Sequence, residues 1–352
     1  MKKLLVVLAV IVGVLALAGV AILWLLDDPN RFKPEIERLI ADSTGFDVSI
    51  QGDLAWQLWP PVVLKGTDIS FSSDDTQYQL GSLALDAGLT PMLSGGDLVI
   101  DDLVLRDLVM TDRKLGDVTD VHRLSLKSFT PGKPSPLELT AILRGPEGTE
   151  GEATAVAVTA LATLDVDADT LKLQDAKIDY GGIDVSCQID ASGLSREPIR
   201  AHERTLDDLL PVDTFRSLDW VADCVIPRLD LEDTSLTNIK VQSKNTGARS
   251  QTNVQVPAVM GGSLSLDVAI DARPATPRWN IESAADGLQS QQVMDVLSPK
   301  MSWVAPLLVG GKFQARGVTA EQLAGSLSGT ANLDAGEGVI DISMIKASLL
   351  TI

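Results

Sequence analysis

The longest apolar stretch of the chain lies at its N-terminus. Leu4–Leu26 is a run of 23 residues without a charge. As a helix rising 1.5 Å per residue, this run spans roughly 34 Å, enough for the ~30 Å hydrocarbon core of a bilayer. Lys2 and Lys3 precede it and two aspartates follow it. This asymmetry predicts a cytoplasmic N-terminus, with the rest of the chain on the other side of the membrane.

A cleavable signal peptide is the alternative interpretation of this stretch. Ala16 and Ala18 form a small-x-small cleavage site after a shorter apolar run. The apolar run continues for eight residues beyond Ala18, which favours a retained anchor. We therefore expect a signal anchor over residues 1–28 and a periplasmic domain over 29–352. The di-lysine start is typical of a bacterial protein, and both interpretations export the domain.

Beyond the anchor the hydrophobic period is first helical and then two-residue. Pro34 suits the first turn of a helix in which Ile36, Leu39 and Ile40 share one face. Later segments alternate apolar with polar or small residues, which is typical of antiparallel sheet with one apolar face. The residues predicted to form this face include Leu83, Leu85, Leu98, Ile100, Leu103, Leu105, Ile183, Val185, Leu264, Leu266, Val268 and Ile270.

Short helices are predicted within Thr205–Leu218, where Pro211 interrupts the pattern, within Ser290–Leu297, and near Ser343. They are too few to cover the apolar face of a large sheet. That face must therefore close on itself, meet a second sheet, or receive a ligand. The stretch 131–152 is rich in proline, glycine and glutamate, which predicts a loop or a sub-boundary there.

Composition restricts the partners and the interior. The formal charge of −19 repels nucleic acid and anionic lipid headgroups. Hydrophobic residues make up 45% of the chain while aromatic residues make up 4%, so the interior must be aliphatic. Cys187 and Cys224 either form a disulfide in an oxidising periplasm or remain as two buried thiols.

The search for catalytic chemistry gives no constellation. His122 and His202 are the two histidines, and no G-x-S-x-G motif is present. Leu206 stands where a metalloprotease helix beginning at His202 needs its second histidine. The run Asp165–Asp169 lacks the glycine and the glutamate of a calcium loop, and a strand with Val166 inward explains it better. The sequence predicts no enzyme activity, no cofactor and no metal site.

Residues 29–69 resemble the N-terminal segment of the AsmA family. The resemblance lies in the segments 29–34, 44–46, 50–56, 59–60 and 64–69, with weaker similarity in 89–105, 289–297 and 323–341. It is poor between residues 131 and 204, and the chain ends at Ile352 within a motif. The motif positions that carry it are Pro29, Asn30, Phe32, Pro34, Gly45, Gly52, Leu54, Trp56, Trp59 and Pro60.

The resemblance implies an elongated antiparallel sheet curled into an apolar, taco-like groove. It also implies a single-pass protein of the bacterial inner membrane that takes part in outer-membrane assembly and passes phospholipids across the periplasm. The leading hypothesis is accordingly a lipid-binding or lipid-transfer scaffold whose partners are membrane phospholipids. The alternative is an assembly factor for outer-membrane proteins, or a partner of periplasmic proteins, whose core is a closed and dry sandwich.

Overall fold

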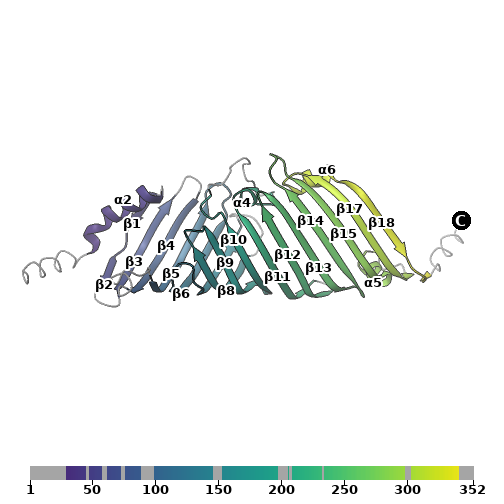
Figure 1. The fold of residues 1–352 in the computed structure, drawn as a ribbon, viewed down its shortest axis with the longest axis horizontal. Helices are drawn as coiled ribbons and strands as arrows, with labels where there is room; N and C mark the ends of the chain where they lie inside the picture. The colour runs from purple at the N-terminus through teal and green to yellow at the C-terminus, as the bar shows by residue number, and fades with distance from the viewer. Residues whose placement is uncertain are drawn as a thin grey trace, which may run out of the picture. The chain divides into compact units, whose positions relative to one another are not determined.

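The computed structural model describes residues 29–44, 47–57, 62–72, 76–88, 99–145, 153–196, 205, 208–231, 234–297 and 303–340 (Figure 1). Contacts within the chain define two units. Unit 1 comprises residues 1–129 and 141–153, and unit 2 comprises residues 130–140 and 154–352. The stretch 131–152, where a sub-boundary is predicted, contains part of this division. The single domain predicted over residues 29–352, with a sub-boundary in 131–152, stays a prediction.

Unit 1 begins with two short helical segments followed by antiparallel strands. Its elements are η1 (Pro29–Phe32), α2 (Lys33–Thr44), β1 (Asp47–Ile50), β2 (Leu54–Gln57), β3 (Val62–Ser72), β4 (Thr76–Gly88), β5 (Val99–Asp112) and β6 (Val118–Phe129). The helix predicted at Pro34 is confirmed, with Pro34 in its first turn. β3 pairs with both β1 and β2, and β4, β5 and β6 follow in chain order.

A line of unpaired positions crosses the strands of unit 1. Asp68, Gly81, Asp107 and His122 interrupt the ladders at the same level of β3, β4, β5 and β6. Asp68 and Asp107 have φ values of +49° and +55°. The alternation of side chains changes its phase at this line. Apolar residues therefore stand at odd-numbered positions on one side of the line and at even-numbered positions on the other, and still lie on one face of the sheet.

Unit 2 is a run of antiparallel strands in chain order. Its strands are β8 (Thr154–Asp165), β9 (Thr170–Tyr180), β10 (Ile183–Ser192), β11 (Asp219–Asp230), β12 (Ser235–Thr246), β13 (Arg249–Val259), β14 (Gly262–Asp271), β15 (Arg278–Gln289), β17 (Pro306–Arg316) and β18 (Ser328–Ala335). β7 (Ser135–Arg144) contributes residues to both units. All described strand pairs are antiparallel, so the protein is mainly β, as predicted.

The sheet of unit 2 is open, and short helices lie at the ends of its strands. Within the described residues, no strand lies along the outer edge of β18. The helices are α4 (Val212–Ser217), α5 (Ser290–Leu297) and α6 (Ala320–Ser326), and β16 (Trp303–Val304) pairs with β19 (Val339–Ile340) as a separate ladder. Figure 1 shows α4 and α6 at one end of the strands and α5 at the other.

A small core closes the strand ends beside α4. Val212, Ala248, Ala272 and Val318 are buried together. The buried side chain of Arg216 donates hydrogen bonds to the carbonyl oxygens of Ala272 and Pro274, at 2.8 and 2.9 Å. The segment around α4 therefore fastens the ends of β12, β14 and β17 to one another.

One predicted strand position is wrong. Val166, expected to point inward, lies in the turn between β8 and β9 and its side chain is 67% exposed. Asp165 instead stabilises this turn, because its carboxylate accepts a hydrogen bond from the backbone N–H of Ala168 at 2.9 Å.

The predicted anchor, Leu4–Leu26, and the helix predicted near Ser343 lie outside the described residues. In the part of the chain that the structure describes, no helix has both the length and the apolar character needed to span a bilayer.

Candidate functional site

An apolar face extends across the strands of unit 2. Side chains alternate between the two faces of a strand, so residues paired across the ladders share a face. One such row crosses eight strands at mid-height: Cys187, Cys224, Val241, Val254, Leu266, Ser283, Gly311 and Ala331. The residues of this row are small or aliphatic, apart from Ser283, and none is charged.

The neighbouring rows extend the same face. On the side of the central row farther from α4 lie Ile226, Ile239, Val256, Leu264, Ala285, Val309 and Leu333. On the side nearer to α4 lie Ala222, Ser243, Thr252, Val268, Ile281 and Phe313. Charged residues at these levels of β10–β18, such as Asp223, Asp267 and Glu282, alternate with these positions and therefore lie on the opposite face.

The strand ends beside α4 are more polar on this face. Asn245 is buried and donates to the carbonyl oxygens of Phe215 and Leu218. The indole N–H of Trp220 donates to the hydroxyl of Ser243 at 3.1 Å. The apolar strip is thus bounded on one side by polar side chains whose N–H groups donate hydrogen bonds within the protein.

No second sheet covers the apolar face among the described elements of unit 2. The main contacts there run between paired strands, and those of α5 and α6 run to the strands next to them in sequence. Toward β18 the face is open to solvent: Leu333 is 61% exposed and Val309 is 37% exposed. An exposed apolar surface costs about 25 cal/mol per Å² in water, so an extended patch implies a ligand or a partner.

Six predicted face residues lie together in unit 2. Leu264, Leu266, Val268 and Ile270 follow one another along one face of β14. Ile183 and Val185 lie on β10, in step with Cys187, and pair with Tyr180 and Ile178 of β9. The alternation of these segments therefore places all six on the apolar face, as the sequence predicts; binding of a ligand there stays a prediction.

The predicted face residues of unit 1 also come into register. Leu83 pairs with Leu105, and Leu85 pairs with Leu103. Ile100 pairs with Ala87 and Phe129. Leu98 lies outside the described residues. Across the line of unpaired positions, four further residues extend the same face at another level: Ile69, Leu80, Leu108 and Val121. Sequence reasoning omitted these four because strict alternation does not allow a strand to change its phase.

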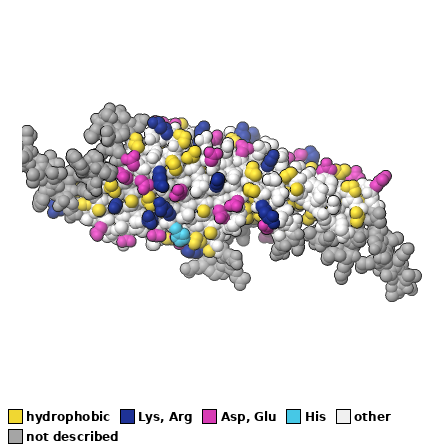
Figure 2. Space-filling model, turned by 90° about the horizontal axis from the view of Figure 1, so that it is seen from below, with side chains coloured by type: hydrophobic (Ala, Val, Ile, Leu, Met, Phe, Trp, Pro, Cys, Tyr) yellow, Lys and Arg dark blue, Asp and Glu magenta, His cyan; other side chains and the backbone are white. Residues whose placement is uncertain are grey.

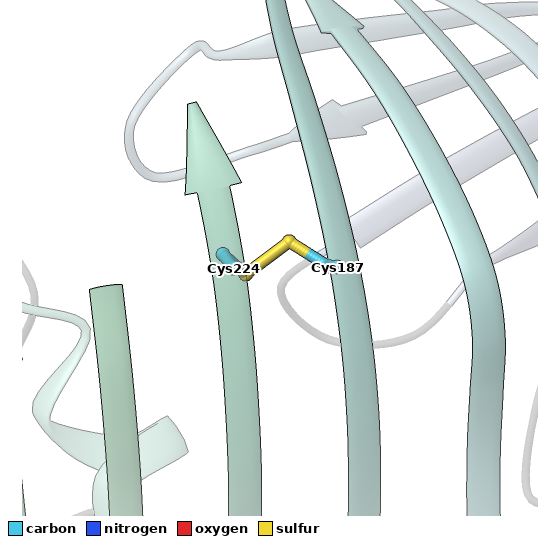
Figure 3. Close-up of a disulfide and its surroundings, with 2 residues drawn as sticks. All are labelled: Cys187 and Cys224. Atoms are coloured by element: carbon cyan, nitrogen blue, oxygen red, sulfur yellow. A yellow bond between two sulfur atoms is a disulfide. The ribbon is translucent and has the colours of Figure 1, made fainter. Parts of the chain in front are cut away.

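Cys187 and Cys224 form a disulfide between the neighbouring strands β10 and β11 (Figure 3). Their Cα atoms are 4.2 Å apart and directly paired in the ladder. The sequence leaves open a disulfide or two buried thiols; the structure has the disulfide. Because structural disulfides persist in oxidising compartments, this bond is consistent with a periplasmic location.

Several predicted motif residues have structural roles. The side-chain amide of Asn30 donates to the carbonyl oxygen of Leu54 at 3.3 Å and accepts from its N–H at 3.0 Å. Pro29 and Leu54 are buried, and Phe32 is half-buried. A Cβ atom at Gly52 would lie 2.3 Å from the hydroxyl oxygen of Thr67, so the close approach of these two segments requires glycine.

The remaining motif positions are less informative. Pro34 is exposed in α2, and Trp56 lies in β2 opposite Leu64. Gly45, Trp59 and Pro60 lie outside the described residues. The motif thus ties the first helices to β2 and β3, and in the described part of it no residue points to catalysis.

Among the described residues, no three His, Cys, Asp or Glu side chains converge as they would at a metal site. The imidazole of His122 lies 3.7 Å from the carboxylate of Asp120. On the face drawn in Figure 2, charged side chains of both signs are interspersed with apolar ones. His202 lies outside the described residues.

Comparison with known proteins agrees with the motif. Residues 1–107 match the model of the AsmA family. Over these residues, the chain is similar to the AsmA family. Over 97 residues it is 29% identical to Protein AsmA of Escherichia coli strain K12. This match covers 27% of the chain but 16% of that longer protein. No solved structure matches the chain.

The similarity to the AsmA family and the disulfide both indicate the cell envelope. The family match ends at residue 107, within β5. The apolar face of unit 2 lies beyond it, so the argument for that face rests on the register of its own strands.

Proposed function

We propose that this chain, which is similar to the AsmA family over residues 1–107, is a membrane-anchored, periplasmic scaffold that binds phospholipids through the apolar face of unit 2. It contributes in this way to phospholipid transport and outer-membrane biogenesis. The observation that carries the proposal is the uncharged surface formed by β10–β18, which no second sheet covers among the described elements.

The chemistry of this face suits acyl chains. Its central part is lined by valine, leucine, isoleucine and alanine, whose side chains offer non-directional contacts. Acyl chains need no specific polar partner, and each buried methylene contributes about 0.8 kcal/mol. A face curled into a groove, as the resemblance implies, would hold acyl chains along the strands' apolar rows and leave headgroups in water.

The predicted anchor gives the scaffold a source of lipid. Residues 1–28 would hold the chain in the inner membrane, and η1 and α2 follow directly. The anchor would then place the first strands of unit 1 next to the outer leaflet of that membrane, which gives lipid a short route onto the protein. Cleavage after Ala18 would remove this route, so the size of the mature protein tests it.

Mass spectrometry of lipid extracted from native and from delipidated protein tests the proposal. Bound phospholipid in the native protein and its absence after delipidation are the expected results. Absence of phospholipid from gently purified protein would contradict it.

Dye binding distinguishes the alternative, an assembly factor with a closed, dry sandwich. An open apolar face should bind a hydrophobic dye such as ANS, and the acyl chains of added phospholipid should displace the dye. A closed sandwich should leave the fluorescence of the dye unchanged.

A further inference from the structure

The polar face of unit 2 carries a cluster of basic side chains at the strand ends beside α4. The chain as a whole is strongly acidic, with a formal charge of −19. Register nevertheless brings four cations together at these ends, all of them exposed. This basic cluster consists of Lys244, Arg249, Arg278 and Arg316.

Two members of the cluster oppose each other directly. Arg278 of β15 pairs with Arg316 of β17 across the ladder. Like charges directly opposite each other destabilise a sheet, because their side chains lie about 5 Å apart at the Cβ atoms. Within the described residues, neither arginine forms an ion pair with a carboxylate. An anionic ligand between the two guanidinium groups would remove this repulsion.

The carboxylates nearest to the cluster are already engaged. Asp271 lies between Arg249 and Arg278 in the same row. Both of its oxygens accept hydrogen bonds from the guanidinium of Arg273, at 2.8 and 2.6 Å. Further along this face, Glu282 pairs with Lys312 at 3.0 Å. Asp271 also attracts Arg249 electrostatically, so the neighbours offset the charge of the cluster only in part.

A hollow of about 520 Å³ lies on this part of the polar face. Lys244, Arg249 and Asp271 line it, together with Gln251 and Asn280, whose side chains can donate hydrogen bonds. Arg278 and Arg316 lie beside this hollow in the ladder and are not part of its lining. Guanidinium groups bind phosphate oxygens with two parallel hydrogen bonds, and amide donors can satisfy the remaining oxygens.

We infer that the basic cluster binds phosphate groups, specifically the headgroup phosphate of an anionic phospholipid. The site lies on the face opposite the apolar rows, so it does not rest on acyl-chain binding. It gives the scaffold a contact for lipid headgroups in a chain whose overall charge repels them.

Calorimetric titration of the full-length chain in neutral detergent tests this inference. The probes are phosphatidylglycerol in mixed micelles, soluble glycerophosphoglycerol and inorganic phosphate. The double variant Arg278→Gln, Arg316→Gln should bind the preferred probe at least about tenfold more weakly, as expected when charge-assisted hydrogen bonds are lost. Lys312→Gln, on the same face but paired with Glu282, is the matched control and should bind as the wild type does.

The three probes distinguish the sources of phosphate. Tighter binding of phosphatidylglycerol than of both soluble probes supports a lipid headgroup as the ligand. Equal or tighter binding of inorganic phosphate overturns that assignment and leaves a site for free phosphate. Binding of none of the probes, a loss of less than twofold in the double variant, or an equal loss in Lys312→Gln overturns the site itself. The double variant should unfold at the wild-type temperature or above, since it removes a like-charge pair.

Discussion

The side chain of Asn30 binds the backbone of Leu54 as a neighbouring strand would. Its oxygen accepts from the N–H of Leu54 at 3.0 Å and its amide nitrogen donates to the carbonyl oxygen at 3.3 Å. One side chain thereby satisfies both backbone groups of a buried residue, 24 positions away in the chain. This pair of hydrogen bonds connects η1 to β2.

Replacement of Asn30 by alanine should loosen this connection. The backbone groups of Leu54 would lose their partners, at a cost of about 1–3 kcal/mol in the free energy of unfolding. Hydrogen exchange at the Leu54 amide should become faster. Asn332→Ala, on the polar face of β18, is the control and should change exchange at Leu54 by no measurable amount; an equal effect would contradict the assigned role.

A second prediction concerns the two glycines Gly52 and Gly325. Gly52→Ala should lower the midpoint of thermal unfolding, because its Cβ would meet the hydroxyl and the carbonyl oxygen of Thr67 at 2.3 and 2.4 Å. Gly325 lies in α6, and nothing lies within 4 Å of a Cβ built there. Gly325→Ala should therefore stabilise the protein by about 0.5–1 kcal/mol. The same sign of effect at both positions would refute this explanation.

The disulfide gives a third prediction. Cys187 and Cys224 are 37 positions apart, so their bond restricts the unfolded chain. Reduction should lower the free energy of unfolding by about 2–4 kcal/mol. The double variant Cys187→Ser, Cys224→Ser should unfold at the same denaturant concentration with and without reductant. A midpoint of the wild type that reductant does not change would argue against a structural disulfide.

A fourth prediction concerns acid. Hydrogen bonds from Arg273 are the main cause that lowers the pKa of Asp271 to about 2. Since the pKa of Asp271 is lower in the folded than in the unfolded chain, its stabilising contribution is present above pH ~4. It is lost as the pH falls from there to about 2. In Asp271→Asn, stability should decline less steeply over that interval in urea titrations. If the free energy of unfolding of Asp271→Asn declines with pH as steeply as that of the wild type, the Asp271–Arg273 pair contributes nothing to stability.

The sheet could be predicted from sequence because alternation is a local signal. Leu264–Ile270 alternates without interruption, and the structure pairs it on both sides in simple register. Unit 1 was harder. Asp68 and Asp107 turn the backbone over with positive φ, so apolar residues such as Leu80 and Leu108 fall out of phase with the pattern before them.

The basic cluster could not be predicted from the sequence. Arg278 and Arg316 are 38 positions apart, and β15 and β17 are separated by α5 and β16. Their direct opposition depends on the register of the ladder between β15 and β17, which no local pattern determines. The partner of Asn30 was equally hidden, because a hydrogen bond from a side chain to a distant backbone leaves no period in the sequence.

The measurement that tests the central claim most directly is the phospholipid content of two matched variants, Leu266→Lys and Ser265→Lys. Leu266 lies in the central row of the apolar face, and Ser265 is its neighbour on the opposite face. Each variant introduces the same charge into the same strand. We expect Leu266→Lys to lose the lipid that co-purifies with the wild type, at an unchanged circular dichroism spectrum, and Ser265→Lys to retain it. Equal lipid content in both variants, or loss in Ser265→Lys alone, would contradict lipid binding on the apolar face.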